Sequence, residues 1–351
     1  MNAATDSRYR VIRGDPSADR ARILELWERC EFVSGERAAA RYDWFYFQNP
    51  AGPGRVYLLF SGDALVGSLG AGSRDIACGS DGAMLKAAML ADFVVDPAHR
   101  TMFPALQLQR VAREHELREA QLIYSIPGEK AEPVFRRLGF SARVSSGNHA
   151  RVLRSAKFVY RVLPRVPTPL VRLVCGVVDR MRLLLPWLRC KLSGVRGQWR
   201  SELPGEIEAL WRNAGSADGV VTGVRDGRFL AWRFHPSRAD WRVLAVTDRG
   251  GKLLAYFVCL CKGDYLWVYD MLPKDREDAV LPLLALVLAG WGEGVNSVRV
   301  PFGGSPRMER ALSSAGYRLR DQRTCFLIQA PGADARPLSA EWWLTKADED
   351  A

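Results

Sequence analysis

The sequence predicts an α/β (α+β) protein built from two tandem domains of one fold. A chain of 351 residues is too long for one ordinary hydrophobic core, so two domains are expected. A series of marks also recurs in the same order at an offset of about 180 residues, which indicates a duplicated fold. Each copy contains a helix that ends in tryptophan, a second aromatic segment, a β-hairpin, a strand with aspartate, and a Gly-aromatic pair. The pairs of marks are Trp27 and Trp211, Trp44 and Trp232, Asp92 and Asp270, and Gly139 and Gly316.

The predicted domain boundaries follow from these repeats. The first domain covers residues 1–150 and the second covers 203–335. Between them lies a basic, apolar helical linker at 151–202, and an acidic tail occupies 336–351. In both copies the hairpins are indicated by Gly- and Asp-containing turns between β-rich runs, such as the turn at 61–63 and the turn at 248–251.

Composition excludes several classes of protein. Apolar residues make up 48% and charged residues 25%, which is typical of a globular protein. No stretch of eighteen apolar residues lacks a charge, which argues against a spanning helix. The first ten residues lack the apolar region of a signal peptide, so we expect a cytoplasmic protein. Seven cysteines without metal-like pairing, together with four histidines, favour reduced thiols and argue against a metal site.

The net charge of +11 is concentrated in one segment. Residues 151–200 hold twelve lysines and arginines against a single acid, Asp179, so the rest of the chain is formally neutral. Prolines, including Pro186, are expected to break this segment into short helices. It is either a linker packed across both domains or an amphipathic element that contacts an anionic membrane, at the inner face of the membrane. Nucleic-acid binding is the least supported alternative, because no recognisable motif accompanies the charge.

The most informative segment runs from Asp92 to Phe140. A buried strand at 92–95 leads through an Asp-Pro turn to Arg100 and directly into a helix. A second strand and helix follow, and they end in Arg136-Arg-Leu-Gly-Phe140. This order places the first N–H groups of a helix, with the positive end of its dipole, at the edge of a sheet, which suits an anionic ligand.

This spacing resembles the acyl-CoA-binding core of the GNAT acyltransferase superfamily. The resemblance covers 40–140 and, in weaker form, 205–328. It implies that each domain is a mixed, mostly antiparallel twisted sheet flanked by helices. It also implies an acyl-CoA, acetyl-CoA or another, as the donor substrate, and an amine as the acceptor.

The resemblance implies a set of donor-binding residues. The family pattern Gln/Arg-x-x-Gly-x-Gly/Ala corresponds here to Arg100, Thr101, Met102, Phe103, Pro104 and Ala105. The central glycine is replaced by Phe103, and Pro104 lacks an N–H, so the loop either binds pyrophosphate through the remaining amides or binds no CoA. The pantetheine arm would pair with the backbone of Phe93, Val94 and Val95.

Two residues are candidates for catalysis. Asp92 is a carboxylate at the start of a buried strand, where it is either a general base or a structural group that bonds nearby backbone. The family's proton-donating tyrosine corresponds to Phe135, which cannot donate, and its asparagine corresponds to Gly128. Tyr124, at the end of the preceding strand, is either a substitute donor or a core aromatic.

The second copy is expected to lack donor binding. No arginine occupies the place of Arg100, and the run Lys274-Asp-Arg-Glu-Asp278 puts three acids where phosphates would lie. We therefore interpret 203–335 as a degenerate copy that shapes the acceptor side.

The leading functional prediction is an acyl-CoA-dependent N-acyltransferase that modifies a small molecule, a sugar or a cell-envelope precursor. Two alternatives remain open. One is a transferase that moves amino acids from aminoacyl-tRNA to peptidoglycan precursors. The other is a catalytically inactive scaffold that docks to a membrane or a partner through residues 151–200.

Overall fold

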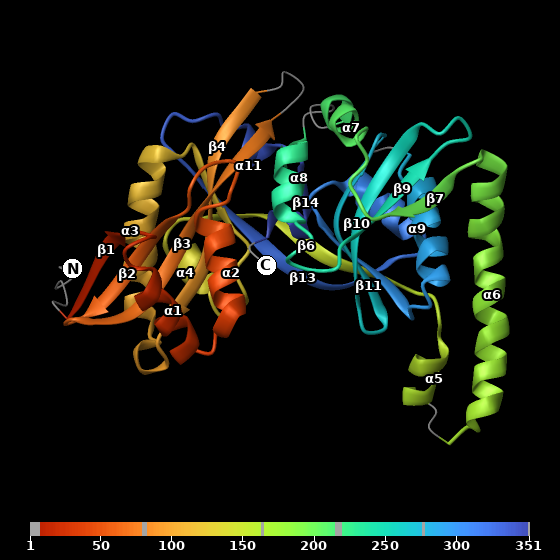
Figure 1. Ribbon diagram of the computed structural model, residues 1–351, viewed down its shortest axis with the longest axis horizontal. Coiled ribbons are helices and arrows are strands. Elements are labelled where there is room, and N and C mark those ends of the chain that lie inside the picture. The colour runs from red at the N-terminus through yellow and green to blue at the C-terminus, as the bar shows by residue number, and fades with distance from the viewer. Residues whose placement is uncertain (1–7, 79–82, 163–164, 215–219, 276–277, 350–351) are drawn as a thin grey trace. The chain divides into compact units, whose positions relative to one another are not determined.

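The computed structural model describes residues 8–78, 83–162, 165–214, 220–275 and 278–349 (Figure 1). The chain forms two compact units. The first comprises the described parts of Met1–Val144, Arg323–Ala340 and Glu349–Ala351, and the second comprises Ser145–Gln322 and Glu341–Asp348. The predicted α/β class is confirmed, because each unit is a mixed sheet with helices on it.

The first unit contains ten elements from the N-terminal half of the chain and two from its end. In chain order these are β1 (Tyr9–Gly14), α1 (Arg20–Arg29), α2 (Gly35–Tyr46), β2 (Arg55–Ser61), β3 (Ala64–Cys78), β4 (Ala83–Val95), the 3₁₀ helix η1 (Pro97–His99), α3 (Met102–Glu119), β5 (Leu122–Ser125), α4 (Glu132–Arg137), the later part of β13 (Arg318–Gln329) and α11 (Arg336–Ser339).

The sheet of the first unit has the strand order β1-β2-β3-β4-β5-β13. Strands β1 to β4 are antiparallel neighbours, β4 and β5 are parallel, and β5 and β13 are antiparallel. The α3 and α4 helices pack on one face, where Leu108, Ala112 and Phe135 join the core of the sheet. On α1, Trp27 donates its indole N–H to Ser68 Oγ of β3 at 3.3 Å, and Ile23 and Leu26 are also buried.

The second unit repeats this order with different strands. Its elements are most of β6 (Ser141–Val152), α5 (Ala156–Val162), α6 (Thr168–Ser193), β7 (Arg196–Arg200), α7 (Ile207–Ala214), β8 (Val221–Gly223), α8 (Gly227–Arg233), β9 (Arg242–Thr247), β10 (Leu253–Lys262), β11 (Tyr265–Pro273), α9 (Val280–Gly292), β12 (Ser297–Gly303), α10 (Pro306–Ser314), the start of β13, β14 (Trp342–Thr345) and the 3₁₀ helix η3 (Lys346–Asp348).

In the second unit the strand order is β7-β9-β10-β11-β12-β6, and β14 pairs with both β12 and β8. Alternating residues of the strands face two cores. Leu244 lies with α9 and α10 on one face, whereas Val243 and Ala245 lie with α7 and α8 on the other. The two sheets therefore have equivalent strands: β1, β2, β3, β4 and β5 of the first unit correspond in this order to β7, β9, β10, β11 and β12 of the second.

The sixth strand is exchanged between the repeats. Strand β6 directly follows the first copy in sequence, yet it pairs with β12 from Ser146 to Val152 in the second unit. Strand β13 belongs to the second copy, yet it pairs with β5 from Phe326 to Gln329 in the first unit. The units therefore depart from the predicted ranges 1–150 and 203–335, because a strand pairs with whichever open sheet edge it can reach.

Two further expectations need correction. The prolines do not break the basic segment into short helices throughout, because α6 runs for 26 residues with Pro186 inside it. Pro186 is buried on the face of α6 that packs against α9, and this tertiary packing offsets the interior-proline cost of about 3 kcal/mol. The range 336–351, predicted as an acidic tail, is part of the fold over its described residues, since Trp342, Trp343 and Leu344 of β14 are buried.

Candidate functional site

Strands β4 and β5 of the first unit separate at one end. They pair only where Ala87–Met89 faces Leu122–Tyr124. At the next residue Ser125 Oγ donates to the backbone oxygen of Leu90 at 3.1 Å, and β5 ends there. Strand β4 continues to Val95 alongside β3. The edge of β4 that faces away from β3 therefore presents backbone groups that β5 does not pair with in the described structure.

A bulge at Asp92 shapes this edge. Asp92 has φ +50°, and the register between β3 and β4 shifts at this point. Its carboxylate is buried, and Oδ1 accepts from the Arg41 guanidinium of α2, at 2.5 Å from Nη2 and 3.1 Å from Nε. Burial, with the Asp92 charge and hydrogen bond, raises the pKa of Tyr46 on the same helix well above its ordinary value. The bulge is thus fixed to α2 by an ion pair.

The start of α3 faces the separated strands. The chain passes from Val95 through η1 and Arg100 to the helix, whose first residue is Met102. Thr101 precedes the helix without a side-chain cap, and no acidic residue lies in the first turn. The N–H groups of this turn have no partner within the helix, so they can donate hydrogen bonds to an anion at the positive end of the dipole. Arg100 is held at this point because its Nε donates to Val95 O at 2.8 Å.

A cavity of about 600 Å³ joins these features. Its walls are the open edge of β4, the first turn of α3, the segment before and within α4, and residues 30–32, which follow α1. The lining residues are Phe93, Val94, Val95, Arg100, Thr101, Met102, Ala105, Lys130, Ala131, Val134, Cys30, Glu31 and Phe32.

Most of the predicted donor-binding residues meet in this cavity. Phe93, Val94 and Val95 come from β4, and Arg100, Thr101, Met102 and Ala105 come from the helix start. Phe103 and Pro104 do not line it. The Phe103 ring is exposed and lies 6.3 Å from the Tyr9 ring, and Pro104 is buried in the first turn. The side chain that replaces the family glycine therefore points away from the cavity.

The two predicted catalytic residues lie outside the cavity lining. Tyr124 is 1% exposed in the middle of the sheet, in register with Met89 on one side and Leu327 on the other. Asp92 is 1% exposed and bound to Arg41 behind the strand. Phe135 of α4 packs against Phe140 and Phe326, with ring centroids at 5.1 Å and 5.7 Å.

Six lining residues were not among the predicted site residues, namely Cys30, Glu31, Phe32, Lys130, Ala131 and Val134. Lys130 adds a second cation beside Arg100, and Glu31 supplies a carboxylate. Cys30 is buried, and burial raises the pKa of its thiol, which disfavours a thiolate. Phe32 completes the wall formed by the residues that follow α1. Lys130 follows Gly128 in the loop after β5, so its position could have been inferred. Nothing in the local sequence indicates that the residues after α1 reach the cavity.

The corresponding place in the second unit is filled by the chain itself. Strands β11 and β12 pair only from Tyr265 to Trp267, and β14 occupies the region beyond. Trp343 is fully buried and donates its indole N–H to Met271 O at 3.2 Å. Gly304 permits this approach, because a Cβ at its φ of +111° would lie 2.1 Å from Trp342 O. Of the predicted run 274–278, Arg276 and Glu277 lie outside the described residues.

The end of β14 is fixed by a buried ionic cluster. Arg225 is fully buried and donates to Asp270 Oδ1 at 2.9 Å and to the Asp348 carboxylate. Burial lowers the pKa of Arg225, but the charges of the two carboxylates raise it by more than burial lowers it. The pKa of Arg225 therefore lies above its ordinary value. Tyr256 donates to Asp270 Oδ2 at 2.8 Å. The aspartate shared by the two repeats is therefore an ion-pair partner of arginine in both units.

Comparison with known structures identifies the fold. A probable N-acyltransferase of unknown function from Enterococcus faecalis V583 superposes with TM-score 0.63 at 10% identity, over 92% of this chain and 72% of that one. A GCN5-related N-acetyltransferase from Anabaena variabilis gives TM-score 0.61 at 12% identity, over 92% and 73%. A tandem GNAT protein from the clavulanic acid biosynthesis pathway gives 0.52 at 12%, over 93% and 100%. No protein-family model and no curated protein matches the sequence. The predicted tandem GNAT fold is confirmed.

Proposed function

We propose that the first unit binds an acyl-CoA, in the first instance acetyl-CoA, and transfers its acyl group to an amine. The observation that carries this proposal is the cavity of about 600 Å³, which combines an open strand edge, an uncapped helix start and two cations. The shared fold with N-acetyltransferases supports it at the level of architecture. We propose the amine of a small molecule, a sugar or a cell-envelope precursor as the acceptor.

The residues of the cavity fit the parts of an acyl-CoA. A pyrophosphate matches the N–H groups of Met102, Phe103 and Ala105 together with the Arg100 and Lys130 side chains. An extended pantetheine arm, with its amide groups, matches the backbone edge of 93–95, which it would extend as an additional strand. Phe103 contributes through its backbone, so the loss of the family glycine is compatible with binding, since its side chain lies outside the cavity.

Acyl transfer to an amine requires one proton to be removed from the amine and one to be supplied to the leaving thiolate. The amine nitrogen attacks the thioester carbonyl carbon, so a C–N bond forms while the C–S bond breaks. The amine loses a proton, and the leaving thiolate takes one up. We assign the proton acceptor to Glu31, acting through water, because it is the one carboxylate among the described residues that line the cavity.

Asp92 then has a positioning role. It lies behind the strand, and its ion pair with Arg41 holds the bulge from which Phe93 to Val95 run. Asparagine tolerates a positive φ, and its side-chain oxygen can accept a hydrogen bond from Arg41. Alanine is disfavoured at a positive φ and has no side-chain acceptor. We expect the acetyl-CoA affinity of Asp92→Asn to stay within about threefold of wild type and that of Asp92→Ala to fall more.

Calorimetric titration of the full chain with acetyl-CoA tests the proposal. We expect micromolar binding that Arg100→Glu weakens by about 30-fold, the equivalent of about 2 kcal/mol for a lost charge-assisted hydrogen bond. Arg118→Glu makes the same charge change at the other end of α3 and should bind like wild type. Absence of binding by the wild-type chain at millimolar acetyl-CoA would overturn the proposal and favour an inactive scaffold.

A kinetic measurement separates the assigned roles. With a panel of primary amines and detection of released thiol, Glu31→Gln should lower kcat by about 10²-fold or more, with little change in acetyl-CoA affinity. Equal rates for Glu31→Gln and wild type would remove Glu31 from the mechanism.

A further inference from the structure

Helix α6 of the second unit has a continuous apolar face that is exposed. One stripe of the helix packs inward through Val171, Cys175, Asp179, Pro186 and Cys190. The opposite side carries apolar residues at intervals of three and four, which places them on one face. These are Leu170, Leu173, Val174, Val177, Met181, Leu184, Leu185, Leu188 and Leu192, each between 45% and 68% exposed. In Figure 1 the helix stands beside β7 and α9, and its inward side packs on α9.

Basic residues border this apolar face on both sides. At 100° per residue, Arg180 and Lys191 project to one side of it, and Arg182 and Arg189 project to the other. All four are exposed. The one acidic residue of α6, Asp179, is buried, accepts from Ser155 N and Oγ at 2.8 Å and 3.1 Å, and lies 3.9 Å from the Arg182 guanidinium. Arg180, Arg189 and Lys191 have no acidic partner on this helix. The exposed surface of the helix is therefore apolar in the middle and cationic at its borders.

A second feature lies at the C-terminal end of the same helix. A cavity of about 730 Å³ is bordered by the last turns of α6, the start of β7 and α9. Three cations line it, Lys191, Arg196 and Arg249, and no carboxylate is among the described lining residues. Its apolar wall includes Trp187 and Leu288, and the Lys191 ammonium lies 4.6 Å from the centre of the Trp187 ring. An anionic group attached to an apolar chain matches this lining.

We propose that α6 and this cavity form a docking surface for an anionic phospholipid bilayer. The apolar face enters the boundary between headgroups and acyl chains, the bordering cations meet lipid phosphates, and the cavity accepts one headgroup. The helix lies in the plane of the membrane, since no described helix is both long and apolar enough to cross one. This surface is independent of the proposed acyl transfer.

Charge distinguishes a bilayer from a second copy of the chain. If two α6 helices packed face to face, the arginines and lysine that border one apolar face would meet those of the other. Like charges at close range oppose association, and no exposed acid on α6 compensates them. Anionic lipid supplies the complementary charge.

Flotation of the full chain with vesicles tests the proposal. Vesicles of phosphatidylcholine alone are compared with vesicles containing one third phosphatidylglycerol, at about 0.1 M salt, where the Debye length is about 10 Å. We expect binding to the anionic vesicles that weakens as salt is raised. Arg180→Glu with Arg189→Glu should reduce the partition coefficient by at least about 25-fold, because each cation near the surface contributes about fivefold.

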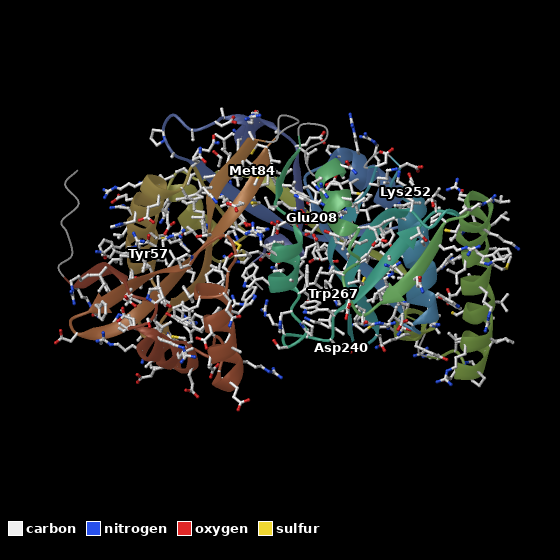
Figure 2. The ribbon with its side chains drawn as sticks, turned by 45° about the horizontal axis from the view of Figure 1, so that its top comes forward. Tyr57, Met84, Glu208, Asp240, Lys252 and Trp267 are labelled. Atoms are coloured by element: carbon white, nitrogen blue, oxygen red, sulfur yellow. The ribbon has the colours of Figure 1, made fainter. Side chains whose placement is uncertain are left out.

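Matched variants control for folding and for total charge. Arg110→Glu with Arg118→Glu makes the same charge change on exposed positions of α3 and should float like wild type. Met181→Glu should abolish flotation, whereas Met84→Glu, at the similarly exposed position labelled in Figure 2, should not. Circular dichroism checks that all variants keep the wild-type fold.

Two outcomes would overturn the proposal. The first is failure of the wild-type chain to float with anionic vesicles at low salt. The second is equal loss of flotation in the α3 and α6 charge variants, which would indicate unspecific attraction. If light scattering also shows a dimer that Met181→Glu dissociates, the apolar face is a contact between copies.

Discussion

Glu116→Ala removes a buried carboxylate that fixes α3, the helix whose first turn borders the proposed donor cavity. Glu116 is fully buried and faces strand β2. Arg55 donates to it through Nη2 at 2.7 Å and Nε at 2.8 Å, and the Tyr57 hydroxyl donates at 2.7 Å. Tyr57 is labelled in Figure 2. Burial and the Glu116 charge raise the pKa of Tyr57 above its ordinary value. The truncation therefore leaves an arginine and a tyrosine hydroxyl without their common acceptor.

The loss in the free energy of unfolding depends on the partners that Arg55 keeps after the truncation. Breaking one side of a buried ion pair costs about 3–5 kcal/mol. Arg55 keeps a hydrogen bond to Ser73 Oγ at 2.8 Å and lies 3.9 Å from Glu119, so the lower end applies. About 3 kcal/mol corresponds to a fall in Tm of about 6–12 °C for a domain of this size. Urea denaturation followed by circular dichroism measures the free energy of unfolding directly.

Glu114→Ala is the matched control, because Glu114 lies on the same helix with its side chain 52% exposed. Its loss should change the free energy of unfolding by less than about 0.5 kcal/mol. Glu116→Gln keeps an acceptor oxygen and should fall between the two. If Glu116→Ala proves as stable as Glu114→Ala, the cluster does not hold α3 on the sheet and the reasoning is refuted.

Two more predictions concern packing and pH. Gly70→Ala should destabilise the first unit by about 1–3 kcal/mol, because its Cβ would lie 2.3 Å from the Tyr46 hydroxyl. Gly128→Ala, where nothing lies within 4 Å, should be neutral, and equal stability of the two variants would contradict this. Stability should also fall above about pH 10 by about 1.4 kcal/mol per pH unit for each tyrosine whose pKa burial raises, because the unfolded chain then releases protons that the folded chain retains. A flat profile in urea titrations up to about pH 11 would contradict this. These tyrosines are Tyr42, Tyr46, Tyr57, Tyr256 and Tyr317.

The duplicated fold and most of the cavity could be predicted because they depend on order along the chain. The strand at 92–95, Arg100 and the start of α3 are consecutive in sequence, so local geometry alone brings them together. The duplication could also be predicted from the sequence, because the same residue types recur in the same order in both copies.

The remaining features depend on long-range contacts. No feature of the local sequence indicates that Glu31 lines the cavity. The same is true of the contact between Asp92 and Arg41, which lie 51 residues apart in the chain. Strand order is similarly non-local: β6 and β13 are each compatible with either sheet edge, and the sequence pattern does not distinguish them. The prediction of a helix break at Pro186 was wrong because interior prolines break isolated helices, whereas α6 is stabilised here by its packing on α9.

The second copy is predicted to lack donor binding, and the end of the chain offers a structural reason for this prediction. Separated strands leave backbone groups and apolar side chains open to water, and this is tolerable where a ligand binds. In the second unit β14 covers the same region: it pairs with β12, its Trp343 bonds Met271, and Asp348 joins the buried Arg225 cluster. An element that completes the sheet in this way removes any need for a phosphate-binding loop there. The acidic side chains of Asp275 and Asp278 are compatible with this prediction, because no anion would have to approach them. Donor binding is therefore expected in the first unit alone, where no strand of the chain takes the place of β14 among the described residues.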